Sequence, residues 1–167
     1  MLGVIYAFQV RNIIVIGLTL IVSCQMKTKT FTSKDRWYSL TLPANWDEYD
    51  DGDEGTHAFF NSKSWTGNLR ITTLHWENRA NEDKAGELIE EEVQENEGAT
   101  LIKVGEFDCA YYKTKAEENG EVTPIYYWTF GKSNNLFICS FTTDEQHERD
   151  KKVIEEVENI IKSIKIN

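Results

Sequence analysis

The amino-acid sequence predicts an α+β fold, a layered α/β sandwich in which helices cover an antiparallel β-sheet. Short segments with the apolar patterns of strands are grouped into hairpins by strong turn signals. Two other segments each carry a single apolar stripe at helical spacing, and such a stripe must be buried against a sheet or another helix. The 167 residues, of which 40% are hydrophobic, suffice for one such domain.

The strand pattern begins after a polar stretch near the N-terminus. Tyr38, Leu40 and Leu42 alternate with more polar residues, which is the period of a half-buried strand, and Pro43 ends it. Two further strands are expected at residues 57–60 and 69–76. A helix should follow, with Asn81 as its N-cap and Gly98 beyond its end. Its apolar positions are Ala85, Leu88, Ile89 and Val93.

The second half of the chain predicts a meander and a final helix. Four strands are expected, at residues 100–106, 109–115, 122–131 and 136–142. Asn119-Gly120 and Ser133-Asn134 are hairpin turn signals, and Pro124 predicts that the start of its strand is not fully paired. Thr143 and Gln146 form a plausible capping box before the last helix. Its apolar stripe is Val153, Val157, Ile160, Ile161 and Ile164.

The N-terminus has the pattern of a lipoprotein signal peptide. Residues 1–23 contain one charged side chain, Arg11, followed by an apolar run at 13–22 that is short for a membrane span. Ile21-Val22-Ser23-Cys24 resembles the bacterial lipobox, in which the cysteine is acylated and becomes the new N-terminus. The alternative is an uncleaved anchor, because residues 1–10 are also apolar.

These observations divide the chain into a signal peptide (residues 1–23), a lipidated tether (24–34) and one domain (35–167). Gln25 rather than Asp after the cysteine resembles lipoproteins sorted to the outer membrane, and Lys27 and Lys29 favour its periplasmic face. We expect the lipid anchor to be the protein's only contact with the membrane.

The charge of the chain excludes some partners. There are 18 Lys and Arg against 28 Asp and Glu, a formal net charge of −10, and no basic cluster offsets it. Such a surface repels phosphate backbones and anionic lipid headgroups, so nucleic acid is excluded as a partner and a basic protein is favoured.

The segment Tyr38-Ser39-Leu40-Thr41-Leu42-Pro43-Ala44-Asn45-Trp46 resembles the opening strand of PsbP-like domains. There, an alternating strand ends in Leu-Pro and a tryptophan follows three residues after the proline. The order of the expected elements and the closing Ile160-Ile161-Lys162-Ser163-Ile164 are also similar to that fold. The resemblance covers residues 35–167 and implies a binding or assembly module, usually without catalysis.

Residues 47–55, here called the acidic loop, are the first candidate site. Nine residues hold two glycines and six carboxylates: Asp47, Glu48, Asp50, Asp51, Asp53 and Glu54. Neither Gly52 nor Gly55 in the sixth position of an EF-hand gives a register that closes a calcium site. The loop is expected to be solvated, and another kind of cation site remains open.

Trp65 is the second candidate, because it lies among polar residues in an expected loop. An exposed tryptophan beside the acidic loop would be an anchor for a partner, whereas a tryptophan folded over the core would have no such role. The sequence leaves both open.

No pattern indicates catalysis, a cofactor or a metal. The histidines His57, His75 and His147 lack the spacing of a zinc site. The two hairpin turns place Cys109 and Cys139 two strands apart, about 10 Å, so we expect two unpaired, buried thiols.

The leading hypothesis is a membrane-anchored bacterial lipoprotein that acts as a non-enzymatic protein-binding or assembly module at the cell envelope. One version is similar to an immunity protein that captures a basic partner. The expected contact residues are those of the acidic loop and Trp65, and the lipidation site is Cys24. The alternative is a small-ligand or cation-binding lipoprotein that uses the acidic loop or a pocket beside the aromatic strand at residues 125–130.

Overall fold

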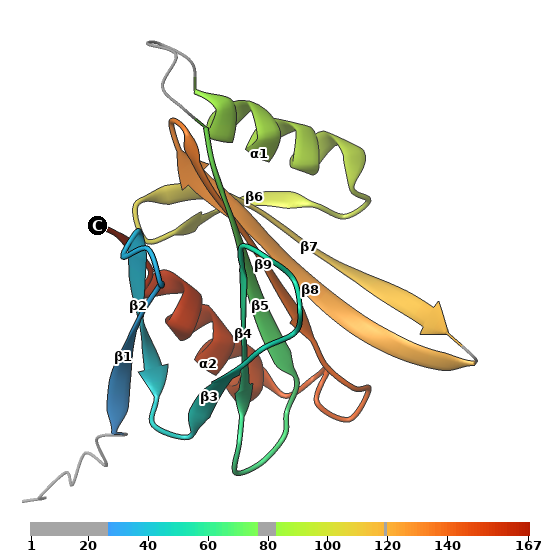
Figure 1. Ribbon diagram of the computed structural model, residues 1–167. Coiled ribbons are helices and arrows are strands. Elements are labelled where there is room, and N and C mark those ends of the chain that lie inside the picture. The colour runs from blue at the N-terminus through green and yellow to red at the C-terminus, as the bar shows by residue number, and fades with distance from the viewer. Residues whose placement is uncertain (1–26, 77–82, 119) are drawn as a thin grey trace, which may run out of the picture.

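The computed structural model describes residues 27–76, 83–118 and 120–167. The described residues form three layers, with helix α1 on one face of a seven-stranded sheet and helix α2 together with a three-stranded sheet on the other (Figure 1). The predicted α+β sandwich is therefore confirmed. The signal peptide, the lipobox with Cys24 and the expected N-cap Asn81 lie outside the described residues.

The large sheet is antiparallel throughout and has the order β3-β4-β5-β9-β8-β7-β6. Its strands are β3 (Trp46–Tyr49), β4 (Thr56–Asn61), β5 (Asn68–His75), β6 (Thr100–Val104), β7 (Phe107–Glu118), β8 (Glu121–Lys132) and β9 (Asn135–Thr142). The pairs Glu118↔Glu121 and Lys132↔Asn135 close two-residue turns where the sequence predicts them. Pro124 lies where β8 extends beyond the end of β9, as predicted.

The small sheet contains β1 (Thr28–Thr32), β2 (Tyr38–Pro43) and the short β10 (Lys165–Ile166). Residues 28–32 were expected in the tether, but they pair with β2 from Thr28↔Pro43 to Thr32↔Ser39. Their threonines suit a strand, and Phe31 packs against the core between Tyr38 and Phe59. The prediction of a tether is therefore wrong over residues 28–32. Their polar composition is typical of a tether, but they form an edge strand through backbone pairing with β2.

Both helices start later than the sequence predicts. α1 (Lys84–Glu95) is capped by Asp83, whose carboxylate accepts the Gly86 N–H at 3.1 Å. α2 (Lys151–Lys162) is capped by Asp150. The predicted capping box is wrong, because the Thr143 hydroxyl donates to the Thr66 carbonyl at 2.6 Å and residues 145–149 form turns.

The main core lies between the large sheet and the layer of α2 and β2. The stripe of α2 is buried at Val157, Ile160 and Ile161, and it faces the alternate aromatic residues of β8. Trp46, at the start of β3, is fully buried and its indole N–H donates to Glu156 of α2. A smaller core on the other face packs Ala85 and Ile89 of α1 against the sheet.

Candidate functional site

The acidic loop is divided between a strand and a turn. Asp47 and Glu48 belong to β3, whereas residues 50–55 connect β3 to β4. The prediction of a loop is wrong at residues 47–49, because Trp46 fixes an edge strand in which Asp47 and Glu48 face solvent and Tyr49 is half-buried. In the turn, the carboxylates of Asp50 and Asp51 accept the backbone N–H groups of Gly52 and Asp53, at 2.9 and 3.2 Å.

Most carboxylates of the acidic loop are paired within the chain. Arg70 of β5 contacts Asp51 through Nε at 2.8 Å and Asp53 through Nη2. Asp47 accepts from Lys29 of β1 at 2.6 Å, and Glu48 contacts His57 at 2.8 Å. The Lys29 hydrogen bond lowers the pKa of Asp47. Two positive charges, Lys29 and Arg70, are thus set against the six carboxylates of the loop.

The acidic loop does not assemble a metal site. Over residues 27–76, 83–118 and 120–167, no group of three or more His, Cys, Asp or Glu side chains is placed to hold a metal ion. The cation-binding alternative therefore lacks a set of ligands in this part of the chain.

Trp65 lies at the other end of β4 from the turn at residues 50–55 of the acidic loop. The turn at residues 50–55 precedes Thr56, and the turn at 62–67, which carries Trp65, follows Asn61 (Figure 1). With six residues at about 3.3 Å each between them, the two turns do not form one surface. The expectation that Trp65 lies beside the acidic loop is therefore wrong for residues 50–55, whereas Asp47, opposite Phe60 in β3, lies close to the turn that carries Trp65.

The turn that carries Trp65 is firmly attached to the fold. The Asn61 side chain accepts the N–H groups of Lys63 and Ser64, both at 3.1 Å. The Thr66 carbonyl accepts from Thr143, and Gly67 packs against Phe141 so closely that no Cβ would fit. Even so, 47% of Trp65 is exposed, and its ring lies at right angles to that of His147 with 6.4 Å between centroids. A rigid turn therefore presents an aromatic ring to solvent.

A hollow of about 520 Å³ lies beside Trp65, and we call it the Trp65 hollow. It is bounded by the start of β8 and by the chain that leaves β9. Its charged lining residues are all acidic: Glu121, Asp144 and Glu145. The backbone N–H and the ring of His147 donate to Asp144, which lowers the pKa of this carboxyl.

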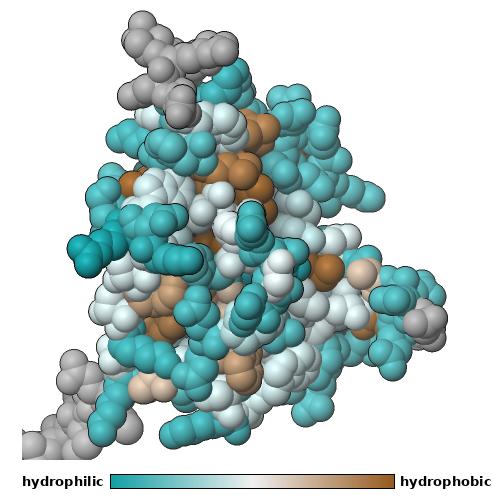
Figure 2. Space-filling model, in the orientation of Figure 1, coloured by the Kyte–Doolittle hydropathy of each residue, from teal (hydrophilic) through white to brown (hydrophobic). Residues whose placement is uncertain are grey.

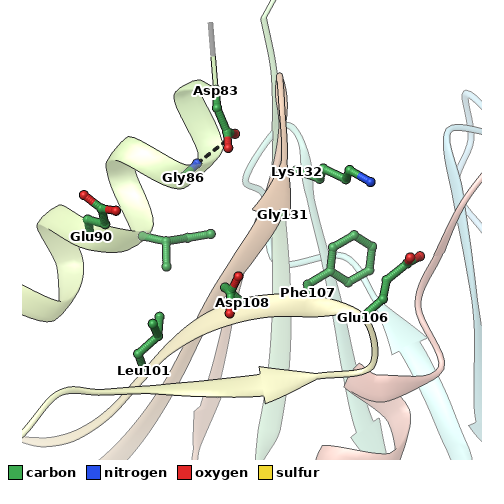
Figure 3. A pocket seen from close by; sticks show the side chains of 10 residues that line it. Asp83, Gly86, Glu90, Leu101, Glu106, Phe107, Asp108, Gly131 and Lys132 are labelled. Atoms are coloured by element: carbon green, nitrogen blue, oxygen red, sulfur yellow. Dashed lines mark hydrogen bonds between the residues drawn. The ribbon is translucent and has the colours of Figure 1, made fainter.

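A second hollow, of about 370 Å³, lies between α1 and the turn from β6 to β7 (Figure 3). Leu101, which is 57% exposed, and Phe107 line it beneath α1, with Glu90, Glu106 and Asp108 around them. Figure 2 also shows apolar side chains gathered beside α1 among hydrophilic ones. No sequence pattern was taken to predict this hollow. A signal was present, because β6 has Leu101 on one face and Ile102 and Val104 on the other, which indicates that both faces are partly covered.

The two cysteines of the described domain lie in the core. Cys109 is opposite Phe130 and Cys139 is opposite Trp128, which is the predicted register, and both thiols are free and buried. Burial raises the pKa of Cys109 to about 12 and raises that of Cys139 as well. Neither thiol is accessible as a nucleophile in this environment.

The comparisons identify the family of the chain. The family described as "Domain of unknown function (DUF3805)" matches residues 26–167. The chain belongs to this family. A search of curated proteins found no match.

Solved structures show the fold. A crystal structure from Bacteroides thetaiotaomicron is 34% identical, with a TM-score of 0.72, over 85% of this chain and 49% of the other. This chain therefore spans about half the length of that relative. The Ran-binding protein Mog1p of Saccharomyces cerevisiae has a TM-score of 0.57 at 8% identity, over 84% of this chain and 96% of its own.

LpqN of Mycobacterium tuberculosis, described as involved in cell envelope biogenesis, has a TM-score of 0.53 at 8% identity, over 86% of this chain and 92% of its own. Mog1p and LpqN have the PsbP-like fold, so the predicted fold is confirmed. At such low identity these likenesses carry no ligand or partner over to this chain. In the described part of the chain, no helix is long and apolar enough to cross a membrane.

Proposed function

We propose that this chain is a lipoprotein of the bacterial cell envelope whose domain binds another protein and catalyses no reaction. The observation that carries the proposal is the Trp65 hollow, where a half-exposed tryptophan on a rigid turn adjoins a concave surface with an acidic lining. Tryptophan is enriched among residues that dominate binding energy, because it buries a large area at little cost in side-chain entropy.

The chemistry of the hollow favours a basic partner. An apolar or aliphatic side chain of the partner would cover the Trp65 ring, and Lys or Arg beside it would meet Glu121 and Glu145. The partner in such a complex is a toxin domain, as for an immunity protein, or a subunit of an envelope complex. The PsbP-like fold supports this class of function, since the notable neighbours are described as a binding protein and an envelope-biogenesis protein.

The acidic loop has a lesser role in the proposal. Asp47, Asp51 and Asp53 are paired with Lys29 or Arg70, and Glu48 contacts His57, so Asp50 and Glu54 are the loop carboxylates without such a contact among the described residues. We assign the loop to long-range attraction of a basic partner, which affects the rate of association more than the stability of the complex.

The location rests on the N-terminal sequence. Lipidation at Cys24 would hold the domain at the outer membrane, and Lys27 and Lys29 favour its periplasmic side. LpqN, a structural neighbour, is also described in connection with the cell envelope. Metabolic labelling with an alkyne fatty acid tests the anchor, because Cys24→Ser should abolish the label.

The binding function is tested by crosslinking in cells that express the full chain at native level, followed by capture and mass spectrometry. The wild type should recover one basic envelope or secreted protein, and Trp65→Ala should lose it. The matched control, Asp50→Asn with Glu54→Gln, should still recover it because these carboxylates lie at the other end of β4. If Trp65→Ala recovers as much of the partner as the wild type does, the Trp65 hollow is rejected as the binding site.

A further inference from the structure

Strands β7 and β8 extend beyond the rest of the large sheet as a two-stranded arm, residues 112–124. β6 pairs with β7 only as far as Tyr111, and β9 pairs with β8 only from Ile125 onward. Figure 1 shows the two strands of the arm projecting together from the body of the domain. Residues 113–118 are all exposed. A two-stranded ribbon without further neighbours is only marginally stable in water.

The outer edge of β7 leaves backbone groups open along the arm. Because Glu118↔Glu121 closes a two-residue turn, alternate residues of β7 point their N–H and C=O groups away from β8. These residues are Lys113, Lys115 and Glu117, and they continue the series in which Tyr111 pairs with Thr100 of β6. No strand of the described chain lies on this side of them. The edge can therefore accept another strand.

The charges along this edge are complementary to those of a second copy of the same strand that runs antiparallel to it. Residues 113–118 read Lys-Thr-Lys-Ala-Glu-Glu, so the inner half is basic and the tip is acidic. We propose that two copies of this chain pair through β7 in an antiparallel register centred on Ala116. In that register Lys115 of each copy lies opposite Glu117 of the other, and Thr114 lies opposite Glu118.

The neighbouring registers bring like charges together. A centre on Lys115 places the two copies of this lysine opposite each other, and a centre on Thr114 places Lys113 opposite Lys115. Lys113 is held by Glu148, whereas Lys115 is 52% exposed and 3.8 Å from the same carboxylate, so its ammonium group is available to a second copy. Charge thus selects a single register.

The free length of the edge fits this pairing. The five residues 114–118 of one copy would cover those of the other, between the last residue paired with β6 and the turn at the tip. Lys115 and Glu117 would exchange four backbone hydrogen bonds with their counterparts, and the two large sheets would become one. This inference is independent of the Trp65 hollow.

A disulfide between identical positions tests the register. Ala116 points its N–H and C=O toward β8, so two copies of Ala116 would form a non-hydrogen-bonded pair with Cα atoms about 4.5 Å apart. Ala116→Cys should therefore give a disulfide-linked dimer under mild oxidation of the full chain, in mild detergent with Cys24→Ser in every sample. Cys109 and Cys139 are buried and do not compete.

Thr114→Cys is the matched control, because it lies on the same face of the same strand and is equally exposed. In the proposed register the two copies of residue 114 are four residues out of line, about 13 Å apart, beyond the reach of a disulfide. Ala116→Cys should crosslink at least about tenfold faster than Thr114→Cys. Equal rates would overturn the proposal, since they would indicate random collision or another partner for this edge.

A charge swap provides the second test. Lys115→Glu alone or Glu117→Lys alone, each added to Ala116→Cys, should slow crosslinking about tenfold by placing like charges opposite each other. The double variant restores opposite charges and should recover the original rate. A double variant no faster than the single ones would overturn the register, and thermal unfolding curves confirm that each variant is folded.

Discussion

The two turns that flank strand β4 differ in the side chains they carry and in how they pack against the rest of the fold. The turn at residues 50–55 leaves open space around its two glycines, and three of its carboxylates, Asp50, Asp51 and Asp53, are bonded to Arg70 or to the backbone of the turn. The turn at residues 62–67 packs on β9 and leaves an uncharged aromatic ring exposed. Composition makes the first turn conspicuous, but the second offers the surface that is free to bind. A count of charges does not indicate whether those charges already have partners.

The largest difference should appear when glycine is replaced in each turn. In Gly67→Ala, the new Cβ would lie 2.5 Å from the Thr142 carbonyl oxygen and from the Phe141 ring, at a φ of +142°. We expect a loss of about 3 kcal/mol in the free energy of unfolding from overpacking and backbone strain. Gly52→Ala, at a φ of +83° with nothing within 4 Å, should lose only about 1 kcal/mol. Urea denaturation of both variants measures this, and equal losses would contradict the contrast in packing.

Binding should show the next largest effect. Trp65→Ala should weaken the affinity for the captured partner about 30-fold, equivalent to about 2 kcal/mol, without a change in thermal stability. Asp50→Asn with Glu54→Gln should weaken it no more than about threefold, mainly through slower association at low salt. Surface plasmon resonance separates the two rates. A greater loss in the loop variant would reverse the roles assigned to the two turns.

The pairing of Arg70 with two carboxylates should have a smaller effect, on stability alone. Arg70→Ala should lower the free energy of unfolding by about 1 kcal/mol at low salt, because Asp51 and Asp53 lose their counter-charge. The loss should shrink at about 0.5 M NaCl, where exposed charges are screened. A loss that does not depend on salt would mean that packing of the Arg70 side chain, rather than its charge, is responsible.

The smallest effect concerns the titration of two carboxyls, Asp47 of the acidic loop and Asp144 of the Trp65 hollow. The pKa of Asp144 is lowered mainly by the hydrogen bond from the backbone N–H of His147, and further by that from the His147 ring. The pKa of Asp47 is lowered by the hydrogen bond from Lys29. Both groups should titrate below 3.8. Since their folded pKa values are depressed, they stabilise the fold above the unfolded value, and this contribution is lost as the pH falls through the folded value.

NMR titration of the carboxyl carbons checks these directions. Lys29→Ala should raise the pKa of Asp47 and leave that of Asp144 unchanged. His147→Ala should raise the pKa of Asp144 only in part, because the backbone N–H at 2.8 Å remains. A midpoint for either carboxyl above 3.8 in the wild type would contradict the described hydrogen bonds.

Sequence patterns predicted the elements with several apolar side chains in the core and missed two strands that contribute one each, Phe31 in β1 and Trp46 in β3. The meander from β6 to β9 follows from alternation and from two turn signals, and its register places both cysteines as expected. β1 and β3 are polar edge strands, stabilised by backbone pairing that leaves little trace in side-chain composition. The caps of both helices were misplaced because several polar residues precede each one, and only tertiary contacts such as that of Thr143 decide among them.

For the candidate site, the sequence identified candidate residues but not their exposure, their partners or their positions relative to one another. Trp65 was identified by its polar neighbours, yet its exposure depends on Gly67 and Thr143, which fix the turn. The partner of Asp51 and Asp53 is Arg70, a residue on another strand with no local link to the acidic loop. The lining of the Trp65 hollow comes from three separate segments, which only the sheet brings together.

The pairing of β1 with β2 also bears on how the domain would stand on a membrane. An anchor at Cys24 would be only four residues from Thr28, a reach of about 14 Å when fully extended. At that end of β1 the Lys27 carbonyl accepts the Ala44 N–H, and the neighbouring Asn45 carbonyl accepts the Ser62 N–H, at the start of the turn that carries Trp65. A lipid attached at Cys24 would thus set this turn at the bilayer side of the domain and point the acidic turn away from it. A protein bound at Trp65 would then lie on the side of the domain that faces the headgroups, so membrane proteins and proteins that cross the bilayer would have the readiest access to it.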